Sequence, residues 1–243
     1  MIPPHHSRGS AGSPLLTRLY QLGARDPLAQ AALTAAITRS TPVYARRELT
    51  GEGRDPGPAR AIVSGWAARV RLLFDGRRQF VSFLLPGDLV GVSHQPDPIA
   101  PSTIVALTDL SVALLPPPAS APGLADAYAM SVALEEAHLI AQITRLGRLN
   151  ALERIGDLLL ELSERLTLAG IGDDDGFAMP LTQEMLADAL GLTPVHVNRM
   201  LQLARREGDI EWRPGRITLS DPARLAQKVG RAPARVSASL PRY

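Results

Sequence analysis

The side chains best suited to chemistry lie between residues 193 and 206. Arginine, glutamine, asparagine and histidine can hydrogen-bond to base edges in the DNA major groove, and arginine can bind guanine through two donors. At helical spacing, one face and its flanks carry Val195, His196, Asn198, Arg199, Gln202 and Arg206. The opposite face carries Val197, Met200, Leu201 and Ala204. This pattern predicts a helix with a buried back and a front that reads DNA.

The residues before this helix predict a shorter helix and a tight turn. Thr182 can cap the first helix, and Gly191 suits the left-handed residue that ends it. Its apolar stripe consists of Leu186, Ala187 and Leu190. Thr193 then caps the second helix, with Pro194 at the first helical position, where a missing N–H costs nothing. We predict a helix-turn-helix; the alternative is an ordinary helical hairpin with a solvated face.

A strand–turn–strand pattern follows at residues 209–219, with Pro214 and Gly215 in the turn. We interpret it as the wing of a winged helix, with Arg213 and Arg216 at its tip facing phosphates. From Pro194 onward, ten Lys and Arg stand against four Asp and Glu, a local charge of +6 on a chain of net charge +2. Such a basic end indicates a phosphate-binding surface. Asp221 and Pro222 open a last short helix, and we expect the tail beyond Gly230 to be disordered.

Composition narrows the functional classes. A chain of 243 residues can form two modest domains. The absence of cysteine excludes disulfides, cysteine-ligated iron–sulfur clusters and thiol chemistry. We find no membrane span and no signal peptide, and expect a cytoplasmic protein without membrane partners. No nucleophile–base pair, HExxH motif, phosphate loop or convincing carboxylate pair is visible, so we expect neither an enzyme nor a metal site.

Residues 41–115 change to short apolar stretches separated by Gly, Pro and Asp. The predicted strands are Ala61–Val63, Ala68–Phe74, Gln79–Leu85 and Thr103–Leu115. Asp75-Gly76 is a strong hairpin signal, because Asp-Gly accepts the positive φ of tight turns. We predict a small antiparallel barrel or β-roll. Short helices are expected at Leu15–Leu22 and Pro27–Thr38, after a disordered arm in which His5 and His6 form only a weak metal site.

A long helix is predicted from Leu124 to Leu149. One apolar stripe consists of Leu139, Ile143 and Leu146, and a neighbouring face of Ala133, Ala137, Ile140, Thr144 and Gly147. Two such faces suggest contact with the chain's own β-domain and with a second copy of the helix in a symmetric dimer. The alternative is a helix buried within one chain. A further helix, Ala151–Leu168, buries Leu152, Ile155, Leu158, Leu159, Leu162 and Leu166. A loop follows, and we interpret the aspartates at 173–175 as a solvated turn.

The predicted fold class is therefore α+β. We divide the chain into a disordered arm and short helix (1–22), a β-roll sensor domain (23–122), a dimerisation helix (123–150), a winged helix-turn-helix (151–229) and a basic tail (230–243).

From about Tyr44 to Gln227 the chain resembles the Crp/Fnr regulators, most specifically in LTQEMLADALGLTPVHVNRML, the following RREGDI and the RITL of the wing. The resemblance implies a cyclic-nucleotide-binding-like β-roll, a dimer helix and a winged DNA reader. It also implies that Arg199 reads guanine and that Thr193 contacts phosphate. Pro194 and Val195 replace the arginine and glutamate of the cyclic-AMP receptor, so we expect a different operator.

The sensor half departs from that family. The corner Gly87-Asp88-Leu89-Val90-Gly91 is kept, but Val92 stands near the glutamate position and Pro101 replaces the arginine that binds the cyclic phosphate. The remaining degenerate pocket consists of Gly87, Asp88, Gly91 and Ser102. A buried phosphate without its guanidinium loses a strong bidentate contact, so we expect no tight cyclic-AMP binding. We assign no cofactor. Haem on His94 or His138 is conceivable, but a lone histidine is more often structural.

The leading hypothesis is a sequence-specific transcription regulator that binds a near-palindromic site on double-stranded DNA as a homodimer. Base contacts are assigned to Arg199, His196, Asn198, Gln202 and Val195. Phosphate contacts are assigned to Thr182, Thr193, Arg206, Arg213 and Arg216. The alternative is a constitutive DNA-binding protein whose β-roll serves only dimerisation or partner contacts. RNA polymerase and an unidentified small-molecule effector are left open as further partners.

Overall fold

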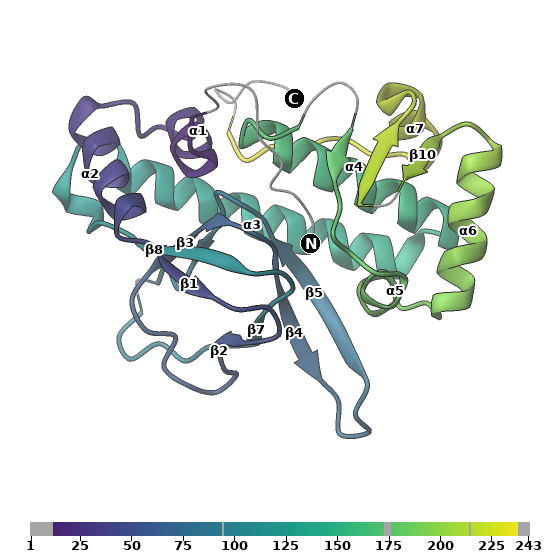
Figure 1. Cartoon of the computed structure of the whole chain (residues 1–243), viewed down its shortest axis with the longest axis horizontal. Helices are drawn as coiled ribbons and strands as arrows, with labels where there is room; N and C mark the ends of the chain where they lie inside the picture. The colour runs from purple at the N-terminus through teal and green to yellow at the C-terminus, as the bar shows by residue number, and fades with distance from the viewer. Residues whose placement is uncertain (1–11, 94, 173–175, 214, 238–243) are drawn as a thin grey trace, which may run out of the picture.

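The computed structural model describes residues 12–93, 95–172, 176–213 and 215–237. Expectations that fall on other residues lie outside the described part of the chain, namely those for His5, His6, His94, Pro214 and the aspartates at 173–175. The long helix α3 (Leu124–Arg148) crosses the width of Figure 1, with the β-sheets below one half and the C-terminal helices and strands at its other end.

Two four-stranded antiparallel sheets form the β-roll. One joins, in spatial order, β1 (Thr41–Val43), β8 (Leu110–Leu114), β3 (Arg60–Ser64) and β6 (Leu89–Val90). The other joins β2 (Glu48–Thr50), β7 (Thr103–Ala106), β4 (Ala67–Leu72) and β5 (Arg78–Leu84). The core between them includes Ile62, Leu84, Val90, Ile104 and Leu110. The expected β-roll is therefore present.

The strand predictions succeed where strands are long. The range 103–115, predicted as one strand, is two strands, β7 and β8, joined by a turn. The strands β1, β2 and β6 were not predicted, because two or three residues are too few to show a period of two. The hairpin at Asp75-Gly76 is confirmed: Gly76 has a φ of 85°, and the Asp75 carboxylate accepts the Arg77 N–H at 3.0 Å.

Two short helices, α1 (Pro14–Gln21) and α2 (Pro27–Thr38), cover one end of α3 and the sheets (Figure 1). In α1, Leu15 and Leu19 are fully buried and pack in a cluster with Leu124 and Tyr128 of α3. The helix α1 was grouped with the arm in the sequence-based division, yet it packs as part of the β-roll assembly. A 3₁₀ turn (Pro118–Ser120) leads into α3.

The helix α3 presents a different face to its own chain than apolar periodicity predicted. Its buried face in the second half consists of Leu134, His138, Gln142 and Arg145. The two predicted stripes are half-buried or exposed instead, with Ile140 58% and Ile143 72% exposed. The expectation that one of those stripes packs on the chain's own β-domain is therefore wrong. The reason is that polar groups of neighbouring elements form hydrogen bonds and ion pairs with the polar side chains on the buried face.

The C-terminal third begins with α4 (Ala151–Leu168), whose first turn carries a capping box between Asn150 and Glu153. The remaining elements are β9 (Phe177–Ala178), α5 (Gln183–Leu190), α6 (Pro194–Arg206), β10 (Ile210–Arg213), β11 (Arg216–Leu219) and α7 (Pro222–Val229). The three strands form one sheet in the order β10-β11-β9. Of the five leucines and one isoleucine predicted to face inward on α4, Leu152 is only partly buried.

The tail does not leave the fold at Gly230. The side chain of Arg231 is only 3% exposed and bonds to Asp157 and Glu164 of α4. The expectation of disorder directly after Gly230 is therefore wrong at this residue, because two carboxylates on α4 bind its guanidinium. Among the described residues, no helix has both the length and the apolar character needed to cross a membrane.

Candidate DNA-binding surface and its connection to the sensor corner

The ends of α5 and α6 are formed by local capping, as predicted. The Thr182 hydroxyl accepts the Met185 N–H at 3.2 Å, and the Thr193 hydroxyl accepts the His196 N–H at 3.2 Å. Gly191 ends α5 in the left-handed region with a φ of 63°. Each threonine hydroxyl keeps its own proton to donate, so capping is compatible with a phosphate contact.

The back of α6 is anchored in the largest apolar cluster. Val197, Leu201 and Ala204 are buried there against α4 and α5, as predicted, whereas Met200 is only partly buried. Because this side cannot rotate without opening the core, the opposite side of the helix has a fixed orientation. α6 therefore presents its polar front rigidly.

The front of α6 carries the side chains predicted to contact bases. Those fully at the surface are Val195, Asn198, Arg199, Gln202 and Arg206, and His196 is half-buried. The guanidinium of Arg199 lies 3.3 Å from the His196 ring, and the Gln183 amide donates to Asn198 at 3.3 Å. The structure thus brings these residues onto one surface. On that surface Val195 is 81% exposed and offers an apolar contact.

The wing follows α6 as an antiparallel pair in which Arg213 lies opposite Arg216. Arg213 is exposed and pairs with Glu211 at 3.3 Å. Arg216 is half-buried and donates to the Gly176 carbonyl at 3.2 Å, which ties β11 to the start of β9. The two arginines therefore differ: Arg213 faces solvent, whereas Arg216 also holds the wing together.

The corner at residues 87–91, called the sensor corner below, contains β6 and begins at Gly87, which adopts a φ of 96°. A Cβ on Gly87 would lie 3.0 Å from the Arg18 side chain, so α1 packs directly on the corner. The buried Asp88 carboxylate accepts the Leu85 N–H at 2.7 Å and binds Arg165 of α4 at 2.5 Å and Arg18 at 3.4 Å. Burial would raise the pKa of Asp88, but Arg165 and Arg18 outweigh it and hold that pKa below its ordinary value.

Of the other residues of the degenerate pocket, Gly91 directly follows β6 and Ser102 directly precedes β7. Gly91 has a φ of 73°, and the Ser102 hydroxyl is buried without a hydrogen-bond partner among the described residues. The carbonyl of Pro101, at the position of the family's phosphate-binding arginine, accepts Arg71 at 2.9 Å. The Asp88 carboxylate is thus used by α1 and α4 rather than held open for a ligand.

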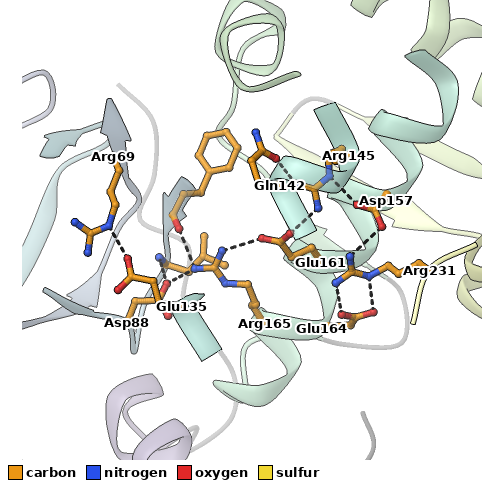
Figure 2. A network of polar contacts seen from close by, with 12 residues as sticks. Arg69, Asp88, Glu135, Gln142, Arg145, Asp157, Glu161, Glu164, Arg165 and Arg231 are labelled. Carbon is orange, nitrogen blue, oxygen red and sulfur yellow. Dashed lines mark hydrogen bonds and ion pairs between the residues drawn. The ribbon is translucent and has the colours of Figure 1, made fainter. Parts of the chain in front are cut away.

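Sequence reasoning missed a buried network of ion pairs that runs from this corner through α4 to α3 (Figure 2). Arg145 of α3, with a side chain 1% exposed, donates to Asp157 at 2.7 Å and to Glu161 at 2.6 Å. Glu161 also pairs with Arg165 at 3.2 Å. Asp157, Glu161 and Arg165 recur at i, i+4 and i+8 on a face of α4 that is otherwise leucine-rich. That spacing was the available signal.

The network fixes the charge of its members. Burial would raise the pKa of Glu161, yet Arg145, His138 and Arg165 lower it to about 2. Burial, helped by Arg165, lowers the pKa of His138 to about 4, so its imidazole is neutral at pH 7. The cavity beside His138 has about 20 Å³, room for a water molecule. Haem does not fit in that space.

Comparison with known proteins finds a matching family model and relatives of this chain. The model of the Crp-like helix-turn-helix domain matches residues 153–228. The nitrogen fixation regulation protein FixK of Bradyrhizobium diazoefficiens is 32% identical over 175 residues, covering 68% of this chain and 70% of the relative. The transcriptional activator protein FnrL of Cereibacter sphaeroides is 30% identical, covering 70% of this chain and 72% of the relative.

Solved structures of other proteins are also similar to this chain. The structure of FixK2 from Bradyrhizobium japonicum superposes with a TM-score of 0.66 at 27% identity, over 80% of this chain and 99% of that one. A CRP-family transcriptional regulator from Thermus thermophilus superposes with a TM-score of 0.63 at 25% identity, over 79% of this chain and 97% of that one. The similarity therefore spans the β-roll as well as the helix-turn-helix.

Proposed function

Because this chain belongs to the Crp/Fnr family of DNA-binding transcription regulators, we propose that it binds a near-palindromic operator as a homodimer through α6, without control by cyclic AMP. The single observation that carries the operator-binding part is the polar front of α6, fixed by its buried back. We assign the chain no catalytic activity and propose that it acts in the cytoplasm.

Residue roles follow from the chemistry of the front. Arg199 is exposed at its centre and reads a base, with guanine favoured because O6 and N7 accept two arginine donors. Val195 offers an apolar contact, of the kind that suits a thymine methyl. His196, Asn198 and Gln202 add contacts beside these. Phosphate contacts from Thr182, Thr193, Arg206, Arg213 and Arg216 set the register on the duplex.

Selection of bound sequences from random double-stranded DNA tests this function. We expect an enriched site with two inverted halves whose centres lie about one helical turn apart, since each protomer supplies one α6. The proposal would be contradicted if the selection recovers only random sequences and the affinity for every DNA falls equally as salt rises. That result would show electrostatic binding without recognition of base sequence.

The homodimer is supported by an apolar face of α3 that the chain itself does not cover. Val132, Ile140 and Ile143 are 43%, 58% and 72% exposed on this helix. A second α3 packed in parallel along the same face would bury them and place both α6 helices at the same end of the pair. Sedimentation velocity at micromolar protein should show a dimer of the 26.0 kDa chain, whereas a monomer there would contradict this part.

Independence from cyclic AMP is supported by the sensor corner. Val92 and Pro101 replace the side chains that the family's cyclic-nucleotide binders use, and the Asp88 carboxylate is bound by two arginines of the chain. We expect calorimetric titration with cyclic AMP to show no heat of binding at micromolar concentrations. Micromolar or tighter binding would refute this part and leave operator recognition intact.

The same occupied corner favours a second candidate, a constitutive DNA-binding protein whose β-roll serves only dimerisation or partner contacts. The two candidates separate in one measurement, operator affinity with and without a fraction of cell metabolites. A metabolite that binds two conformations unequally changes the operator affinity. A constitutive binder has the same operator affinity with and without metabolites.

A further inference from the structure

A cavity of about 140 Å³, called the α4–α7 cavity below, lies in the C-terminal third of the chain. It is enclosed by α4, α6, β10 and α7, and the last three of these elements lie together at the right of Figure 1. Its walls are mainly apolar and include Ile155, Leu159, Ala204, Ile210, Leu225 and Val229. All six of these side chains are buried in one apolar cluster. The cavity is therefore a space within the core and not a groove of the surface.

The volume of the α4–α7 cavity decides what it can hold. Protein interiors are close-packed and contain few voids larger than a water molecule, so a void of about 140 Å³ is large for the core of a small domain. An apolar cavity of about 150 Å³ in another protein stays dry and binds benzene. The α4–α7 cavity therefore has room for a compact molecule of about six to eight non-hydrogen atoms.

Two small residues help to shape this space. Gly156 lies in the interior of α4, where glycine is unfavourable. A Cβ on it would lie 3.0 Å from the Val229 side chain and 3.2 Å from that of Leu225, so the glycine lets α7 pack close to α4. Ala204, on the buried back of α6, offers only a methyl group to the cavity. A molecule in the cavity would therefore contact α6 from behind.

The charged side chains that line the α4–α7 cavity already have partners within the chain. The Glu153 carboxylate accepts the Asn150 N–H at 2.8 Å. The Asp209 side chain, 3% exposed, binds Lys228 at 2.5 Å and Arg224 at 3.1 Å. A charged ligand would thus enter an apolar space without an unpaired group of opposite charge among the described lining residues, and burying an unpaired charge is costly. The cavity therefore favours an uncharged ligand.

We propose that the α4–α7 cavity is a binding site for a small, uncharged apolar molecule, aromatic or branched aliphatic, of about the size of benzene. Such a site lies in the C-terminal third of the chain instead of the β-roll, and so goes beyond the proposed function. Binding there does not require that α6 reads DNA. Failure of this site would therefore leave operator recognition intact.

Methyl NMR of the full chain, titrated with benzene as the probe, tests the site. We expect saturable shifts at the methyl groups of Leu225 and Val229, with a dissociation constant of about 1 mM or tighter, which a ligand of this size can reach. The methyl groups of Ile104 and Leu110 in the core of the β-roll are the internal control and should not shift. Benzoate, which adds a charge to the same ring, should bind at least about tenfold more weakly.

Filling the cavity should abolish this binding. Ala204→Leu should weaken benzene binding by at least about tenfold, and Ala204→Val, the smaller addition, should weaken it less. Arg205→Leu places the same leucine at the next, exposed position of α6 and is the matched control, which should bind benzene as the wild type does.

Three results would overturn the assignment. The first is a wild type without saturable shifts at Leu225 and Val229, or with equal shifts in the β-roll. The second is unchanged benzene binding in an Ala204 variant that keeps the wild-type circular dichroism. The third is benzoate binding as tight as that of benzene, which would overturn the uncharged class of ligand.

Discussion

Replacing Arg145 by methionine should destabilise the protein in a way that depends on pH. The side chain of Arg145 is 1% exposed and binds the carboxylates of Asp157 and Glu161. Glu161 has a pKa of about 2 against an ordinary value of 4.5, so its environment favours the charged form by about 3 kcal/mol. Among the charges that lower this pKa, Arg145 contributes most. Without it, burial dominates, and most of that free energy is lost at pH 7.

The sign of the pH dependence follows from linkage. A carboxylate with a lowered pKa stabilises the fold above its unfolded pKa, and this stabilisation disappears as pH falls through the folded value. For Glu161 the window runs from about pH 5 down to about pH 2. We expect Arg145→Met to cost about 3 kcal/mol at pH 7, less than the upper range for breaking a buried pair because Arg165 and Arg231 remain. The difference from wild type should shrink below pH 5.

Urea unfolding followed by circular dichroism at pH 7, 5 and 4 measures both quantities. Arg148→Met, an exposed arginine at the end of the same helix, is the control and should change the free energy of unfolding by no more than about 0.5 kcal/mol. A cost for Arg145→Met below about 1 kcal/mol, or one that stays constant with pH, would refute the assignment of a charged, arginine-stabilised Glu161.

Three further predictions concern DNA reading, assembly and the sensor corner. Arg199→Ala should cost about 1–3 kcal/mol of binding free energy at the selected operator and relax specificity at one base pair, as measured by fluorescence anisotropy. Arg205→Ala, exposed on another side of α6, should not relax that specificity. Equal losses of affinity on specific and random DNA would contradict base reading. Ile143→Glu should convert the dimer to monomer in sedimentation velocity, and a persistent dimer would exclude this face of α3 as the seam. Gly87→Ala should lower the free energy of unfolding by about 1–3 kcal/mol, through a φ of 96° and the close approach of α1; Gly208→Ala, with a φ of 72° in open space, should cost less, and equal costs would show that packing on the corner is unimportant.

The helix-turn-helix could be predicted because its signals are local. Thr182 and Thr193 cap helices through the N–H three residues ahead, and Gly191 ends α5 by its own backbone conformation. The period of Val197, Leu201 and Ala204 then decided which side of α6 faces the core. Such features depend on residues within one or two turns, so the sequence alone determined the DNA-reading motif and its exposed face.

The sensor corner and its connections could not be predicted in the same way. Arg18, Asp88 and Arg165 meet across 70 and 77 residues of chain, and no periodicity records a charge attraction over such separations. Apolar pattern also misassigned the inner face of α3, because His138, Gln142 and Arg145 are buried by partners on other elements.

The sequence by itself thus determined the family, the α+β class and the side of α6 that faces solvent. Only the tertiary structure decided that the chain's own arginines occupy the sensor corner and that buried ion pairs join it through α4 to α3. The physical reason is that capping and amphipathic period act along the chain, whereas ion pairing acts through space between elements that the fold alone brings together.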